Sequence, residues 1–385
     1  MLSELHQFKL PETVIFGWGA TERVGEQARR FGRRALLISG STATKSSSRH
    51  ISEALKAEGV EVTTFDRIES EPTAAVVEAA VGVVRESGCE VVVGVGGGSP
   101  LDVGKAAAGL APLEKPFIEY LRGKAKIDRP GVPFIAIPTT AGTAAEITRN
   151  AVFLDEENTV KLAVRSDFLL PKVALVDPEL TMTMPPALTA ASGMDALSHA
   201  VESFVSTRAN PVSEALSARA IFLIVGAIRQ AYADGTNRQA REDMCMASMI
   251  AGMAFSNVGC GAAHALAHVV GPAFNLSHGA ACGLLLPYVL GFNLPVCRDK
   301  VQRIGHFLSG RPRQELAPEQ AVDMIFELLA KLQLPSALTH PDWSKTDLVF
   351  LVPGAMLSGA LQTNPRPVQE TDLLAILQRA FRGRA

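Results

Sequence analysis

The sequence contains little cysteine, and its cysteines are not spaced as a disulfide framework. Five occur among 385 residues, and no two are arranged as Cys-x-x-Cys. Small secreted domains carry paired cysteines and thiolate zinc sites carry Cys-x-x-Cys, so both classes are disfavoured. We interpret the five cysteines as inert core residues of a protein in a reducing compartment, the cytoplasm.

The sequence also lacks a dense block of lysine or arginine. Its 37 basic and 39 acidic residues leave a formal net charge of −2. Binding to nucleic acid or to an anionic membrane surface needs a basic patch. The charge pattern therefore argues against both partners and favours a small-molecule ligand.

Long hydrophobic runs are absent as well. Residues 220–228 are apolar but lie between Arg219 and Arg229, whereas a helix needs about 20 apolar residues to cross a bilayer. Near the start of the chain, Glu4 and Lys9 interrupt the stretch where a secretion signal would need an apolar core. We therefore expect buried helices, with neither a membrane span nor a secretion signal.

The length predicts two domains, because a typical domain has about 150 residues. From 34 to 177, short β-branched runs alternate with segments of helical apolar spacing, which is typical of βαβ units and a mostly parallel sheet. The expected strands are 35–38, 60–65, 91–95, 134–137 and 173–176, and the expected helices are 51–58, 73–86 and 101–109. The first half therefore has the pattern of an α/β nucleotide-binding domain.

Strand-like runs almost disappear after Pro185 and Pro186. The second half is rich in Ala, Leu and Met at three- and four-residue spacing, which predicts an all-α domain. We place an α/β domain over 1–184 and a helical domain over 185–385, with the ligand expected between them, where concave sites commonly form. The Ser/Thr-rich segment 39–48 is predicted to be a loop.

A glycine-rich segment joins an expected strand directly to an expected helix. It contains Gly96, Gly97, Gly98 and Ser99, followed by Pro100. Glycines let the backbone approach a phosphate, and a helix N-terminus offers free N–H groups and a partial positive charge. The spacing differs from G-x-G-x-x-G, and the alternative is a tight turn with Pro100 at the first helical position. The strand context favours the phosphate site.

A second candidate segment follows the strand expected at 134–137. Thr139, Thr140 and Thr143 lie in it, and their hydroxyls can bond a ribose, a phosphate or a base. Thr143 and Glu146 also have the spacing of a capping box, which would start a helix instead. The segment alone does not separate these interpretations.

One aspartate and four histidines form the candidate site that we call the Asp/His cluster: Asp195, His199, His264, His268 and His278. The first two, and the next two, are four residues apart, so on a helix each pair lies on one face. A carboxylate with several imidazoles suits a first-row transition metal.

The first pair also has a simpler interpretation. Asp195 and His199 alone match an i,i+4 surface pair. His264 and His268 lie in an apolar stretch, where imidazoles need partners because an unsatisfied buried polar group costs about 1–3 kcal/mol. No glutamate follows His264, so the H-E-x-x-H metalloprotease pattern is absent. Considered together, the five residues favour a metal site.

In this order, the motifs resemble the iron-containing, or group III, alcohol dehydrogenases, the family of lactaldehyde reductase and propanediol dehydrogenase. The resemblance covers essentially the whole chain, through 15–20, 96–102, 137–146, 193–199, 255–259, 264–278 and 364–366. It implies an N-terminal α/β domain that binds NAD(P), a helical domain that holds the metal, and reversible hydride transfer between nicotinamide and a small alcohol or aldehyde. The implied metal is Fe(II), and Zn(II) also suits such a site.

The resemblance further implies roles for single residues. The metal ligands would be Asp195, His199, His264 and His278, with His268 beside them as a proton relay. Asp102 would approach the nicotinamide-side ribose. The residues expected to contact NAD(P) are Gly40, Gly96, Gly97, Gly98, Ser99, Asp102, Thr139, Thr140, Thr143, Asn150 and Lys161.

One position departs from the family pattern. Many NAD-preferring members carry an aspartate after the first strand of the nucleotide domain, where its charge would repel a 2′-phosphate. Gly40 occupies the aligned place here, with Lys45 just beyond. The missing carboxylate makes the site compatible with NADP as well as NAD.

Three other functions share part of this pattern. They are a maleylacetate-type reductase without a metal, a dehydroquinate-synthase-like lyase, and a non-catalytic nucleotide-binding sensor. The intact metal set disfavours the first, and the absence of a visible basic substrate pocket disfavours the second. For the dehydrogenase, the expected partners are a small alcohol or aldehyde and further copies of the chain, as a homodimer or larger homo-oligomer, with no nucleic acid and no membrane.

Overall fold

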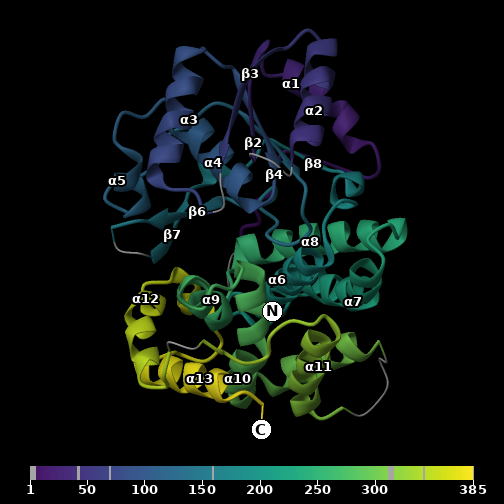
Figure 1. The fold of residues 1–385 in the computed structure, drawn as a ribbon, viewed down its shortest axis with the longest axis vertical. Coiled ribbons are helices and arrows are strands. Elements are labelled where there is room, and N and C mark those ends of the chain that lie inside the picture. The colour runs from purple at the N-terminus through teal and green to yellow at the C-terminus, as the bar shows by residue number, and fades with distance from the viewer. Residues whose placement is uncertain are drawn as a thin grey trace. The chain divides into compact units, whose positions relative to one another are not determined.

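The computed structural model describes residues 6–40, 44–68, 71–157, 160–310, 316–340 and 343–384. The chain divides into two compact units, Lys9–Thr183 and Met184–Ala385, the second of which includes the residues before Lys9. We call them the α/β unit and the helical unit (Figure 1).

The α/β unit is built on a six-stranded parallel sheet with the order β1-β8-β5-β4-β2-β3. Its strands are β1 (Thr13–Phe16), β2 (Arg34–Gly40), β3 (Glu61–Ile68), β4 (Val91–Gly96), β5 (Phe134–Pro138) and β8 (Val173–Val176). An antiparallel pair, β6 (Asn150–Asp155) and β7 (Val160–Arg165), forms a second sheet. The parallel sheet confirms the predicted α/β class.

Helices cover both faces of the large sheet, because successive side chains of a strand point to opposite faces. In β2, Leu36 and Ile38 join one apolar core with α3 (Ala74–Glu86) and α4 (Gly98–Leu110). Ala35 and Leu37 join another core with α1 (Val24–Arg29) and α2 (Lys45–Ala57). The remaining helical segments are η1 (Ala20–Arg23), α5 (Phe117–Leu121), η2 (Asp167–Leu169) and η3 (Pro178–Thr181).

The strand order indicates a binding site at one end of this sheet, where the carboxyl ends of the strands lie. From β2 the chain adds β3 on one side, then returns to add β4, β5 and β8 on the other, so the order reverses between β2 and β4. Open α/β sheets bind ligands at the carboxyl ends of their strands, next to such a reversal. Gly40 ends β2 and Gly96 ends β4, which places two predicted cofactor residues there.

The predicted strands and helices of this unit are present with shifted ends. Two local predictions are wrong. Segment 39–48 is not a loop throughout, because β2 continues to Gly40 and α2 begins at Lys45, while 41–43 lie outside the described residues. The tight-turn alternative placed Pro100 at the first helical position, but α4 begins two residues earlier, at Gly98.

The helical unit contains no strand among its described residues, which confirms the predicted helical C-terminal region. Its longest helices are α6, α7, α8 and α10, and α6 packs against the other three. The helical segments are α6 (Pro186–Val205), α7 (Pro211–Ala233), α8 (Arg238–Val258), α9 (Ala262–Ala273), α10 (His278–Ser309), α11 (Pro318–Lys331), η4 (Asp347–Leu351), α12 (Val352–Met356), η5 (Gly359–Thr363) and α13 (Glu370–Arg382).

Two helices, α7 and α10, are long and apolar enough to cross a membrane by length and composition alone, and the bent pair α8 and α9 would make a third. The expectation that no segment reaches this length is therefore wrong, because it considered only uninterrupted apolar runs. The apolar window of α10 is 72% buried in the folded chain, since Leu284, Leu285 and Val289 belong to the core of the helical unit.

Candidate metal centre and nucleotide-binding edge

Helix α6 carries the first two residues of the Asp/His cluster in the interior of the helical unit. Asp195 and His199 are only 2% and 5% exposed, so the surface-pair interpretation is wrong. A neighbouring glycine lets another helix come close to them. A Cβ at Gly279, in α10, would lie 2.2 Å from the carbonyl oxygen of Ala191 in α6.

Helices α9 and α10 bring the other histidines to Asp195. His264 lies in the first turn of α9, His268 lies one turn later, and His278 is the first residue of α10. Asp195 Oδ1 is 3.5 Å from His264 Nε2 and 3.8 Å from His278 Nε2. The sequence placed these groups far apart, and the packing of three helices joins them.

Ring contacts complete the Asp/His cluster. The ring of His199 stacks on that of His264, with centroids 4.3 Å apart, and also on Phe255, at 3.9 Å. His268 stacks on His278, with centroids 5.4 Å apart, and is partly exposed. The structure thus brings all five predicted residues together, with His268 at the more exposed margin.

These residues fit a divalent cation. Asp195 Oδ1 and His264 Nε2 are buried, and neither atom has a hydrogen-bond partner among the described residues. Donor atoms about 2.1 Å from a tetrahedral ion lie about 3.4 Å from one another, close to the 3.5 Å between these two atoms. An ion bound to both would remove the cost of leaving them unsatisfied.

Two overlapping groups of donor atoms have the spacing of metal ligands. One is Asp195, His264, His278 and Cys282, and the other is His199, Cys260 and His264; in each, all donor atoms lie within 4.8 Å of one another. His264 belongs to both groups and so links the four predicted ligands. Cys260 and Cys282 therefore lie beside the predicted ligands, and their interpretation as inert core residues stays a prediction. Burial raises the pKa of the Cys282 thiol to about 12, so without a metal it is neutral at pH 7.

The electrostatics of the Asp/His cluster favour a positive ion. Burial opposes the charge of Asp195, but the neighbouring imidazoles, His199 foremost, hold its pKa below the usual range. Burial also opposes a charge on His264, yet the thiols and carboxylates around it raise its pKa well above the ordinary value. The lowered pKa keeps Asp195 ionised, and the raised pKa of His264 indicates negative potential at that ring, where a metal ion could replace the proton.

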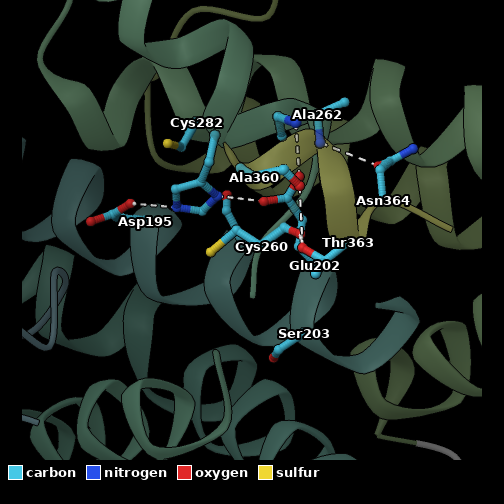
Figure 2. A network of polar contacts seen from close by, with 12 residues as sticks. Asp195, Glu202, Ser203, Cys260, Ala262, Cys282, Ala360, Thr363 and Asn364 are labelled. Atoms are coloured by element: carbon cyan, nitrogen blue, oxygen red, sulfur yellow. Dashed lines mark hydrogen bonds and ion pairs between the residues drawn. The ribbon is translucent and has the colours of Figure 1, made fainter. Parts of the chain in front are cut away.

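One buried acid beside the cluster was not predicted. Glu202 is 3% exposed, and its carboxylate contacts Nδ1 of His264, on the ring edge opposite the one that faces Asp195 (Figure 2). It follows Asp195 by seven residues, a spacing that keeps both on one helix face. That spacing is the signal by which sequence analysis could have found it.

In the α/β unit, the predicted phosphate-binding residues lie at the carboxyl ends of the strands, next to the reversal of the strand order. Gly96 has a φ of +150°, and a Cβ there would lie 2.6 Å from Cγ of Pro100, so glycine is required. Gly97 caps α4 without a side chain, and Gly98 and Ser99 begin the helix. The free N–H groups of the first turn of α4 therefore belong to this loop.

The predicted threonines border the same loop. A Cβ built at Gly97 would lie 3.5 Å from Thr140, and one at Gly98 would lie 3.2 Å from Thr143. The N–H of Thr139 donates to the carbonyl of Gly96 over 3.0 Å. Residues 139–149 form turns and bends, so the capping-box interpretation is wrong because no helix follows.

Gly40 also lies beside this loop, since a Cβ there would be 3.6 Å from Cγ of Pro100. Asp102 makes contacts within the α/β unit: its Oδ2 accepts the N–H of Val152 over 2.9 Å, and its Oδ1 lies 3.4 Å from Nζ of Lys105. Asp102 therefore ties α4 to β6.

Asn150 and Lys161 are not brought together. In the antiparallel pair Asn150 faces Arg165, whereas Lys161 faces Leu154, at the opposite end of the ladder. Lys161 also forms an ion pair with Glu71. The two residues can therefore contact only different parts of an extended ligand.

Comparison with known proteins supports the resemblance inferred from the motifs over nearly the whole chain. Residues 11–178 match the model described as iron-containing alcohol dehydrogenase, and residues 189–381 match the C-terminal model of the Fe-containing alcohol dehydrogenase family. The chain is 37% identical to 1,3-propanediol dehydrogenase from Klebsiella pneumoniae, over 99% of this chain and 100% of that protein. It is 34% identical to lactaldehyde reductase from Escherichia coli (strain K12), over 97% and 98%. The structure of sulfoacetaldehyde reductase from Bifidobacterium kashiwanohense in complex with NAD+ superposes with a TM-score of 0.88, at 30% identity over 97% and 98%.

A parallel sheet with a glycine-rich loop and a helical unit with a buried Asp/His cluster fit the class of nucleotide- and metal-dependent oxidoreductases. The chain belongs to the iron-containing alcohol dehydrogenase family. It is an enzyme that acts on CH–OH groups and interconverts alcohols with aldehydes, and the family implies iron and NAD(P) as its cofactors. The resemblance inferred from the motifs is confirmed.

Proposed function

We propose that the Asp/His cluster is the catalytic centre of a dehydrogenase that interconverts a small primary or secondary alcohol and its carbonyl product with NAD(P). Its ligands would be Asp195, His199, His264 and His278. The observation that carries the proposal is the pair of buried atoms without hydrogen-bond partners, Asp195 Oδ1 and His264 Nε2. An iron held there would supply a Lewis acid that favours the alkoxide of the alcohol.

His268 is proposed as the group that moves the proton. It lies beside the ligands without belonging to either group of donor atoms, and it is partly exposed. A neutral imidazole can accept a proton at one ring nitrogen from the alcohol, directly or through water, and return it in the reverse reaction. The ligands would thus hold the reactants while His268 serves the proton transfer.

The α/β unit is proposed to bind the dinucleotide. Gly96, Gly97, Gly98 and Ser99 would hold the pyrophosphate at the N-terminus of α4, with Thr139, Thr140 and Thr143 beside it. Asp102, Asn150 and Lys161 remain proposed contacts toward the nicotinamide end. Gly40 brings no carboxylate to the loop, so we propose use of NADP as well as NAD. The NAD+ complex of the similar sulfoacetaldehyde reductase supports a nicotinamide dinucleotide.

We further propose that the units act as domains with limits at 1–184 and 185–385, and that the enzyme works in the cytoplasm as a homodimer or larger homo-oligomer. The cysteines, which are all free, support a reducing compartment. The burial of the apolar residues of α10 supports a role in the protein core rather than in a membrane. The net charge of −2 supports the absence of a nucleic-acid partner.

The test combines elemental analysis of the purified protein with a nicotinamide absorbance assay, using NADH and NADPH over short aldehydes, ketones and maleylacetate. We expect about one divalent metal per chain and steady turnover of short aldehydes. Absence of turnover across the panel would support a sensor. Turnover of maleylacetate by metal-free protein would support a maleylacetate-type reductase.

A further inference from the structure

We propose that Glu202 sets the tautomer of His264 and thereby keeps Nε2 of that ring available to the metal. Glu202 would be a positioning residue, because it acts through His264 and contacts neither substrate nor cofactor. The inference rests on the proposed metal centre and concerns a residue outside the four proposed ligands.

The contacts of the two carboxylate oxygens carry the proposal. Oε2 of Glu202 contacts Nδ1 of His264, and Oε1 accepts the backbone N–H of Ala263 over 2.8 Å (Figure 2). A carboxylate has acceptors only, so its imidazole partner must donate. The ring proton of His264 therefore belongs on Nδ1.

This proton placement fixes the chemistry of the other ring nitrogen. A neutral imidazole has one N–H, so a proton on Nδ1 leaves a lone pair on Nε2. Nε2 is the buried atom that lies 3.5 Å from Oδ1 of Asp195 without a hydrogen-bond partner among the described residues. Histidines that bind metals generally donate their second N–H to a carboxylate or carbonyl, which fixes tautomer and orientation.

Glu202 is itself held in place by the start of α9. The helix is preceded by Gly261, which has no side chain to cap it. The first two N–H groups of α9 find partners elsewhere: that of Ala262 donates to Oδ1 of Asn364 over 3.2 Å, and that of Ala263 donates to Glu202. The same carboxylate therefore caps α9 and orients the histidine in its first turn.

Two further features restrict movement of this carboxylate. A Cβ at Gly261 would lie 2.8 Å from Oε1 of Glu202 and 2.8 Å from Oδ1 of Asn364, so only glycine allows this approach. Asn364 is fixed by paired hydrogen bonds with Asn293, of 2.8 and 3.0 Å. Glu202 thus meets His264 with a defined orientation.

This orientation makes the isosteric change E202Q informative. The N–H of Ala263 needs an acceptor, so the amide oxygen of Gln would take the place of Oε1. The amide NH₂ would then face Nδ1 of His264, which would have to accept, and the ring proton would move to Nε2. E202Q should therefore impair metal binding more than E202A, which removes the carboxylate but imposes no tautomer.

The experiment compares wild type, E202Q, E202A and the matched control E214Q. Glu214 lies on α7 and pairs with Lys300 and Arg303. Zn(II) affinity would be measured by competition with a chelator, and the His264 tautomer by long-range ¹H–¹⁵N NMR of metal-free protein, at a pH above the raised pKa of this ring so that it is neutral. We expect about a 10- to 100-fold loss of affinity in E202Q, a smaller loss in E202A and none in E214Q. The His264 proton should lie on Nδ1 in wild type and on Nε2 in E202Q.

Zn(II) affinity of E202Q within about twofold of wild type, or a wild-type proton on Nε2, would overturn the role of Glu202. A larger loss in E202A than in E202Q would also overturn it, because packing alone would then explain the effect. If E202A does not fold, the comparison of E202Q with E214Q still tests the role of Glu202. Failure of the wild type to bind any divalent metal would instead contradict the proposed metal centre.

Discussion

The α/β unit and the helical unit each bury a charged group, and they satisfy it differently. Lys105 of the α/β unit is 1% exposed, and its Nζ donates to Thr148 over 2.8 Å and to the carbonyl of Asn150 over 2.7 Å, beside Asp102 at 3.4 Å. In the helical unit, Asp195 Oδ1 and His264 Nε2 face each other without a hydrogen-bond partner among the described residues. A buried charge with a complete set of partners serves the fold, whereas atoms that lack partners indicate a ligand.

The largest expected effect comes from removing a proposed ligand. His264→Ala should lose metal and activity together, with a loss of metal affinity greater than the roughly 100-fold that removal of an outer-shell partner costs. His268→Ala should keep the metal and lose about 100- to 10,000-fold in turnover, the usual contribution of a general acid or base. Metal content and kcat of both variants check this division, and equal metal loss in the two would contradict it.

The second test separates the two groups of donor atoms. If the fourth ligand is His199, as proposed, then His199→Ala should lose the metal and Cys282→Ala should retain it. Co(II)-substituted wild-type protein should show no thiolate-to-metal charge-transfer absorption. Metal loss in Cys282→Ala together with retention in His199→Ala would assign the fourth position to the thiol, which lies 3.5 Å from Nε2 of His278.

The third test addresses Lys105, the buried charge that has hydrogen-bond partners. Lys105→Met should lower the free energy of unfolding of the α/β unit by about 3–5 kcal/mol, because Asp102 would keep a buried charge without its cation. Metal content should not change. The matched control is Lys172→Met, at an exposed ion pair with Glu12, which should cost less than about 1 kcal/mol. Denaturant unfolding followed in both variants gives the answer, and equal effects would show that the buried pair has no special role.

The smallest effect is the pH dependence due to Glu146. Burial raises its pKa to about 7 from an ordinary 4.5, so the folded state holds this proton more tightly than the unfolded state. The resulting stabilisation is complete below about pH 4.5 and is lost as the pH rises through 7. Glu146→Gln should therefore match wild type near pH 4 and exceed its stability at pH 8 by up to about 3 kcal/mol. Unfolding measured at several pH values checks this, and a difference independent of pH would refute the shift.

The burial of each strand explains whether it could be predicted from the sequence. Strands β2, β4, β5 and β8 are short apolar runs buried in a parallel sheet, and such runs stand out in the sequence. Strand β1 has four residues, all partly exposed, and gives little signal. Strand β6 alternates buried and partly exposed residues, so its period of two could have revealed it.

The Asp/His cluster was visible because its residue types are unusual in apolar helices. Its further neighbours were not, because they depend on how α6, α9 and α10 pack. The spacing from Asp195 places Glu202 on the same helix face, but nothing in the sequence relates Glu202 to His264, which follows 62 residues later, or brings Cys260 and Cys282 to the same place. Local spacing predicts one helix face, whereas a site formed by three helices depends on tertiary contacts.

The most direct test of the proposed metal centre is anomalous diffraction from crystals of metal-loaded protein, recorded on both sides of the iron and zinc absorption edges. We predict one strong peak per chain, within about 2.0–2.2 Å of Asp195 and of the nitrogen atoms of His199, His264 and His278. Metal-loaded crystals without a peak at these side chains, or with a peak bound elsewhere in the chain, would contradict the proposed centre.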